Sequence, residues 1–101
     1  MASDLEALKT WVEIDLSALR TNLRALRQVI GPGRQIILVV KSDAYGHGAG
    51  TVASVAAAEG VRHFAVATVD EGIALRRADV SSEILLLHAP LDFEIPAIIE
   101  W

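Results

Sequence analysis

The sequence predicts an α/β fold built around a parallel sheet. Three segments with strand character, Gln35–Val40, His63–Thr68 and Glu83–His88, alternate with segments of helical periodicity. Strands separated by such helices need crossover connections, and right-handed crossovers produce a parallel sheet. Ile36–Val40 and Ile84–Leu87 are apolar at every position, as strands covered on both faces are. Two architectures fit this order, a doubly wound sheet and the first part of a (β/α)8 barrel.

The helices follow from the spacing of apolar residues. A helix is expected over Ala18–Ile30, with Ser17 as its N-cap, because Leu19, Leu23 and Leu26 fall on one face. The glycine-proline-glycine run at 31–33 ends it, since proline cannot continue a helix. The remaining helices are expected at about Thr51–Glu59, Val69–Ala78 and Ile95–Trp101.

A short strand is also expected ahead of the first helix. Trp11–Leu16 alternates apolar and acidic residues, which indicates a half-buried strand. No crossover precedes this segment, so we expect it to lie away from the parallel sheet.

Composition excludes several classes of protein. The chain has 101 residues, of which 52% are hydrophobic and 22% charged, with a net charge of −4, so one domain at most is expected and no basic face for nucleic acid. The apolar runs are far shorter than the ~20 residues of a membrane helix. The absence of cysteine excludes disulfides and thiolate metal sites, and three histidines without paired carboxylates predict no metal site. Asp4 and Glu6 argue against a secretory signal, so a cytoplasmic location is expected.

The strongest functional signal is a lysine at the end of a strand. Lys41 follows the apolar run and precedes Gly46, Gly48 and Gly50. Ligands of parallel α/β folds bind at the carboxyl ends of the strands, where Thr68 and His88 also fall. The glycine spacing matches neither G-x-G-x-x-G nor G-x-x-x-x-G-K-[ST]. An amine positioned at a strand end is what Schiff-base chemistry requires.

The octet K-S-D-A-Y-G-H-G, residues 41–48, resembles the signature of the alanine racemases, which carry pyridoxal 5'-phosphate (PLP) in a barrel domain. The segments "WVEIDLSALRTNLRALR", "FAVATVDEGIALR" and "ILLL" are similar to that family's opening strand and helix, second barrel strand and helix, and third strand. The resemblance extends from Trp11 to Trp101. It departs at Ser42, where alanine is commoner, and at His88, where glycine is expected.

The resemblance implies the first part of a (β/α)8 barrel and the interconversion of L- and D-alanine, which supplies D-alanine for the cell wall. Lys41 matches the lysine that carries PLP as an aldimine and acts as the base on the D-alanine face of Cα. Tyr45 matches the tyrosine whose hydroxyl donates to the cofactor phosphate. Leu87 matches an apolar residue near the cofactor ring.

The resemblance also implies that this chain lacks part of the active site. Racemisation needs an acid/base group on each side of a planar carbanion. In the family the opposing base is a tyrosine of a C-terminal domain, contributed across a homodimer interface. We expect residues 1–16 to join such a C-terminal β domain and residues 17–101 to form the first βα units of the barrel. The chain is therefore expected to be an N-terminal piece that is inactive alone.

Three alternatives stay open from the sequence. They are a racemase that accepts a wider range of amino acids, a PLP-binding barrel protein without turnover, and a nucleotide-binding α/β module, which the glycine spacing disfavours.

The other polar residues have structural explanations. Asp43 and His47 are expected to stabilise the loop. His63 precedes its strand, at the opposite end from the expected ligand site. For His88 the sequence favours equally a position lining a cofactor pocket and a position facing solvent. Asp70 and Glu71 open a helix, where negative charge suits the helix dipole, so we assign them no catalytic role.

Overall fold

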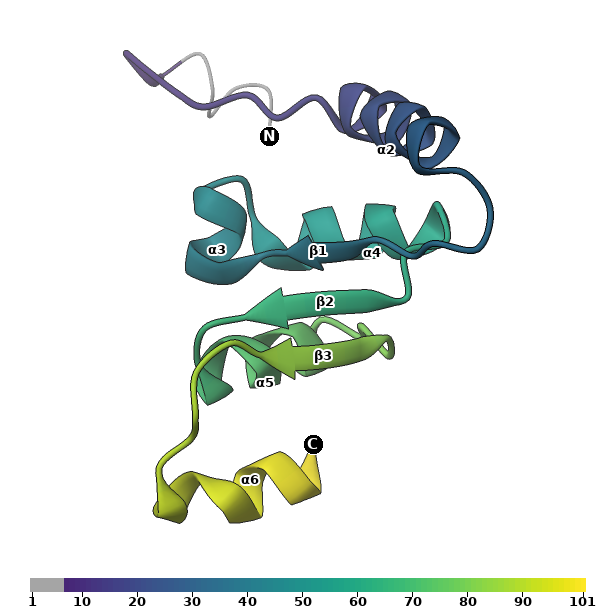
Figure 1. Ribbon diagram of the computed structural model, residues 1–101. Coiled ribbons are helices and arrows are strands. Elements are labelled where there is room, and N and C mark those ends of the chain that lie inside the picture. Colours follow the sequence, from purple (N-terminus) through teal and green to yellow (C-terminus); the bar gives the residue numbers. More distant parts are fainter. Residues whose placement is uncertain (1–6) are drawn as a thin grey trace.

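The computed structural model describes residues 7–101, which form one sheet with helices and turns around it (Figure 1). In chain order the elements are α2 (Leu16–Ile30), β1 (Ile37–Val39), α3 (Lys41–Tyr45), α4 (Ala49–Ala58), β2 (His63–Val66), α5 (Val69–Arg77), β3 (Glu83–Leu86), a 3-10 turn (Asp92–Glu94) and α6 (Ile95–Glu100). Within the described part of the chain, no helix is long and apolar enough to cross a membrane.

The three strands form a parallel sheet in the order β1-β2-β3, as the alternation of elements predicts. Leu38 pairs in register with Phe64, and Phe64 with Ile84. The next row along the strands joins Val39, Ala65 and Leu85. Because side chains alternate between the two faces of a sheet, these two rows point to opposite faces.

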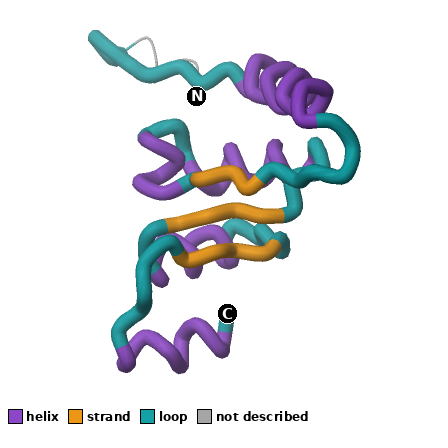
Figure 2. Tube along the Cα trace, in the orientation of Figure 1, coloured by secondary structure: helices purple, strands orange, loops and turns teal. Residues whose placement is uncertain are grey.

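One face of the sheet carries the hydrophobic core. Helices α4 and α5 lie behind the strands in Figures 1 and 2, and Phe64 and Val66 are fully buried beneath them. Ala53 and Ala56 of α4 are also fully buried, and their small side chains allow the helix to approach the sheet closely. Helix α2 packs on α4 through Leu23, which is 3% exposed.

No helix of the range 7–101 lies on the opposite face of the sheet (Figure 1), although Ala65 at its centre is only 1% exposed. Ile37 remains 53% exposed, Leu85 51% and Leu87 44%, although all three are large and apolar. An apolar face of this kind on a parallel sheet is normally buried. The strands were expected to be covered on both faces, and in this structure only one face is.

The strand expected at Trp11–Leu16 does not form. Residues 11–15 have no regular secondary structure and are exposed, and Leu16 is the first residue of α2. A strand needs a neighbour to accept and donate its backbone hydrogen bonds, and none of the described residues pairs with this segment. The segment lies away from the sheet, as expected (Figure 1). Residues 1–6 of the expected N-terminal unit lie outside the described residues.

Several element boundaries also differ from those expected. Asp15 rather than Ser17 caps α2, because its Oδ1 accepts a hydrogen bond of 3.0 Å from the Ala18 N–H. Each strand is shorter than its expected range, and α4 begins at Ala49, two residues before the expected Thr51.

Candidate functional site

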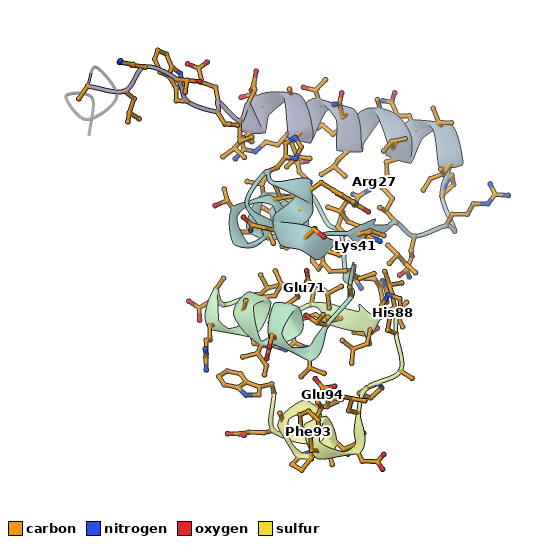
Figure 3. All side chains as sticks on the ribbon, turned by 90° about the vertical axis from the view of Figure 1, so that its left-hand side faces the viewer. Arg27, Lys41, Glu71, His88, Phe93 and Glu94 are labelled. Atoms are coloured by element: carbon orange, nitrogen blue, oxygen red, sulfur yellow. The ribbon has the colours of Figure 1, made fainter. Side chains whose placement is uncertain are left out.

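The candidate site lies at the carboxyl edge of the sheet, which Figure 3 faces. Lys41 follows β1 closely, and Leu87 directly follows β3. The parallel ladder continues past the strand ends, because the Val40 N–H donates to the Ala65 carbonyl and the Leu87 N–H to the Val66 carbonyl, each at 2.9 Å. The structure thus brings Lys41 and Leu87 to the same edge, as the sequence predicts.

The segment after Lys41 is not the simple loop expected but a left-handed helical turn. Ser42, Asp43 and Ala44 have φ of 52°, 55° and 53° with ψ near 45°, and Tyr45 has a φ of 57°. For a residue with a side chain, this conformation costs roughly 1–2 kcal/mol each. Backbone strain of this kind concentrates at binding and catalytic sites, where the surrounding structure holds it in place.

Backbone and side-chain hydrogen bonds hold this turn in place. The Ala44 N–H donates to the Val40 carbonyl at 2.9 Å, and the Ala49 N–H donates to Asp43 Oδ1 at 2.8 Å. His47 Nδ1–H donates to the Ala44 carbonyl at 2.9 Å. The stabilising roles expected for Asp43 and His47 are therefore confirmed. Gly48, with a φ of 90°, supplies a conformation that other residues rarely adopt.

The turn leaves three chemically different groups at one edge. The Lys41 side chain is half-buried, Tyr45 is 60% exposed at the end of α3, and Leu87 extends the bare apolar face. An amine, a phenolic hydroxyl and an apolar surface together suit a cofactor that has a carbonyl, a phosphate and an aromatic ring. The residues present therefore fit PLP.

Glu71 of α5 reaches the same edge, which no pattern in the sequence predicts. Its Oε1 accepts from the N–H groups of Ala67 and Thr68, at 2.8 and 3.0 Å. Its Oε2 accepts from the Ser42 N–H at 2.6 Å. The motif T-x-x-E at 68–71 predicts only the first part of this arrangement, a capping box, which the structure contains. Figure 3 labels Glu71 and Lys41 at this end of the molecule.

The hydrogen bonds to Glu71 also set its charge state. Burial by itself would raise the pKa of the Glu71 carboxyl. The N–H donors of Ser42, Ala67 and Thr68 outweigh burial, and they hold the pKa of Glu71 below its ordinary value. The carboxylate is therefore ionised at neutral pH, the form that accepts these bonds most strongly.

A hollow of about 260 Å³ lies beside the carboxyl ends of β2 and β3. Thr68, Leu86, His88 and Glu94 are among its lining residues. His88 is exposed at this edge, so the structure brings it to the site end without giving it a hydrogen-bond partner among the described residues. A larger hollow of about 550 Å³ lies near Arg27 and Arg62, at the amino end of the strands. We place the site at the carboxyl edge, because ligands of parallel sheets bind there.

The remaining histidine has the structural position expected. His63 begins β2 at the amino end of the sheet, and its Nε2 lies 2.9 Å from Glu83 Oε2. Among residues 7–101 no group of three or more histidine, aspartate or glutamate side chains is placed to hold a metal ion.

The structure is that of a parallel α/β protein with a lysine positioned at the carboxyl end of its first sheet strand. The sequence matches the family described as "Alanine racemase, N-terminal domain" over residues 14–101. The chain belongs to this family.

Individual relatives agree with this assignment. The alanine racemase of Nostoc sp. is 49% identical over 96 residues, which are 92% of this chain and 24% of the relative. That of Geobacillus kaustophilus is 48% identical over 80 residues, 79% of this chain and 21% of the relative. The chain thus spans about a quarter of the length of the curated relatives it matches.

Solved structures support the architecture. An alanine racemase of Clostridium difficile superposes with a TM-score of 0.88 at 39% identity, covering 92% of this chain and 25% of that one. An alanine racemase of Bartonella henselae, described with covalently bound pyridoxal phosphate, superposes with a TM-score of 0.76 at 31% identity, covering 86% of this chain and 24% of that one. The expected fold, the first part of a (β/α)8 barrel, is confirmed.

Proposed function

We propose that this chain provides the PLP-binding lysine of an alanine racemase, a PLP-dependent isomerase that interconverts L- and D-alanine. The observation that carries the proposal is the position of Lys41 at the carboxyl edge of the sheet, directly before a left-handed turn that ends in Tyr45. Membership of the alanine racemase family supports it. The bound cofactor named for the Bartonella henselae structure supports the choice of PLP.

Each residue at the edge has a separate task in this proposal. Lys41 Nζ would hold the cofactor covalently, and its amine would move a proton at one face of the substrate Cα. The Tyr45 hydroxyl would donate to the cofactor phosphate, and Leu87 would exclude water from one side of the ring. PLP, when bound, supplies the electron sink that makes the Cα proton of an amino acid removable.

A second proton-transfer group is needed on the other face of Cα. The chain has one tyrosine, Tyr45, which the proposal assigns to phosphate. We propose that the opposing group comes from a C-terminal domain of a partner subunit in a homodimer, as the resemblance implies. We also propose that residues 1–16 belong with that domain, and the separation of residues 11–15 from the sheet supports this (Figure 1).

The test uses a chimera in which this chain replaces the matching quarter of the Clostridium difficile protein. Borohydride treatment after loading with PLP should fix a phosphopyridoxyl group on the peptide that carries Lys41. Lys9, the only other lysine of this chain, serves as the internal control. The chimera should form D-alanine from L-alanine, and Lys41→Arg should lose both label and activity, because a guanidinium stays protonated.

Label on Lys9 instead of Lys41, or none on this chain, would contradict the proposal. Label on Lys41 without turnover in a folded chimera would favour a PLP-binding protein that is not an enzyme. Assaying other L-amino acids, such as serine, distinguishes an alanine racemase from one of wider specificity.

A further inference from the structure

The carboxylate of Glu71 connects two loops that are far apart in the sequence. One loop is the turn after β2, whose Ala67 and Thr68 N–H groups donate to Oε1. The other is the turn after β1, whose Ser42 N–H donates to Oε2 over 2.6 Å. The two carboxylate oxygens therefore serve different loops, and one side chain ties the carboxyl ends of β1 and β2 together.

The bond from Ser42 is not needed to cap helix α5. The capping box is complete with the Glu71 N–H donating to Thr68 Oγ1 at 3.1 Å and the Thr68 N–H donating to Oε1. Oε2 is thus available for a contact outside its own helix. It accepts the shortest of the hydrogen bonds to this side chain, and a charged acceptor makes such a bond about twice as strong as a neutral one.

The residue that Oε2 holds is the one next to the lysine. The Ser42 N–H belongs to the peptide unit between Lys41 and Ser42, and Ser42 is the first residue of the left-handed turn. Peptide units are planar, so fixing this N–H also fixes the Lys41 carbonyl and restricts the orientation of the Lys41 Cα. A strained turn persists only where its surroundings hold it, and Glu71 is one such restraint.

We propose that Glu71 is a positioning residue for Lys41. It holds the Lys41–Ser42 peptide unit against the end of β2, so that the amine meets the cofactor and the substrate Cα in one geometry. This inference rests on the proposed function, since it names the residue that aligns the proposed PLP lysine. The Glu71 carboxylate accepts hydrogen bonds from the backbone N–H groups of Ser42, Ala67 and Thr68, so we place it behind Lys41 and not on the substrate.

The decisive variant is Glu71→Gln in the chimera. Glutamine has the same size, and its amide oxygen can still accept from Ala67 and Thr68. Its NH2 group then faces the Ser42 N–H, so a donor opposes a donor and the tie between the loops is lost. Asp70→Asn is the matched control. This substitution removes the same charge from the same helix turn, and Asp70 is exposed. Leu75→Val, in the buried face of α5, controls for loss of stability alone.

Two measurements separate positioning from mere stability. Amide hydrogen exchange, which needs no cofactor, should become faster in the peptide covering residues 42–46 of Glu71→Gln and stay unchanged in both controls. With PLP loaded, the visible circular dichroism band of the cofactor should weaken, and kcat should fall on the order of 10- to 100-fold with KM changed much less. Both controls should keep the dichroism band and the unsubstituted KM.

Each contrary result has a distinct meaning. Unchanged exchange at residues 42–46 in Glu71→Gln would overturn the inference, and so would an unchanged dichroism band and kcat while Lys41 still carries the label. Absence of label from Lys41 in the unsubstituted chimera would overturn the proposed function and this inference with it. The expected result for Glu71→Gln is faster exchange at residues 42–46, a weaker dichroism band and a lower kcat. None of these changes is expected in Asp70→Asn or Leu75→Val.

Discussion

The isolated 101-residue chain should associate through the bare face of its sheet. A compact monomer of 10.8 kDa exposes about 5,500 Å², whereas this chain exposes 7339 Å². Its radius of gyration is 15.6 Å, compared with about 13 Å for a compact domain of this length. The excess, about 1,800 Å², is comparable with the total area of a specific protein–protein interface.

Part of the excess lies on one identifiable surface. Ile37, Leu85 and Leu87 are each between 44% and 53% exposed on or next to the uncovered face, and both outer strands, β1 and β3, have an unpaired edge. Burial of the exposed half of Leu85 contributes about 1 kcal/mol. In a symmetric pair of chains both copies of Leu85 contribute, about 2 kcal/mol together. Losing both contributions raises the dissociation constant about 30-fold.

Leu85→Lys tests this directly, with Val29→Lys as the matched control. Val29 is 82% exposed but lies on α2, away from the sheet. Sedimentation equilibrium should show association of the unsubstituted chain, the predicted rise in the dissociation constant for Leu85→Lys, and little change for Val29→Lys. A monomer at all concentrations that unfolds cooperatively would refute the reasoning, because the exposed apolar face would then carry no measurable cost.

Three further predictions concern the turn, the core and pH, each measured in the chimera. Ser42→Gly should raise the free energy of unfolding by about 1 kcal/mol, because glycine adopts the left-handed conformation without strain. Ser17→Gly, in a right-handed helix, should lower it by a similar amount. Urea titrations in which both variants change the free energy of unfolding in the same direction would contradict this. Phe64→Ala should lower the free energy of unfolding by about 3–5 kcal/mol, since Phe64 is fully buried. A variant as resistant to protease as the unsubstituted protein would contradict this packing. The pKa of Glu71 is lowered in the folded protein, so its carboxylate contributes its full stability at pH values above the ordinary glutamate pKa, about 4.3. This contribution disappears as the pH falls through the lower folded-state pKa. The stability difference between the unsubstituted protein and Glu71→Gln should therefore be constant near neutrality and shrink in acid, and a difference that grows in acid would be contrary.

Sequence patterns were enough to predict the order of elements, the parallel sheet and the edge at which Lys41 lies. These follow from local patterns, because apolar runs, helical periodicity and turn residues each act over a few neighbouring positions. The octet at 41–48 also indicated the family, since its combination of lysine, tyrosine and glycines is specific. Asp43 and His47 were correctly predicted to stabilise the loop because their bonds reach only a few residues along the chain.

Features that depend on residues far apart in the sequence became visible only in the folded chain. Trp11–Leu16 has the alternation of a strand, but no described residue pairs with it, so its pattern is not enough. Nothing local predicts a left-handed turn at Ser42, Asp43, Ala44 and Tyr45, because these residue types disfavour it and its restraints include a side chain 29 positions away. The second role of Glu71 was missed for the same reason. Its capping motif is visible in four consecutive residues, whereas its bond to Ser42 exists only once β1 and β2 lie side by side.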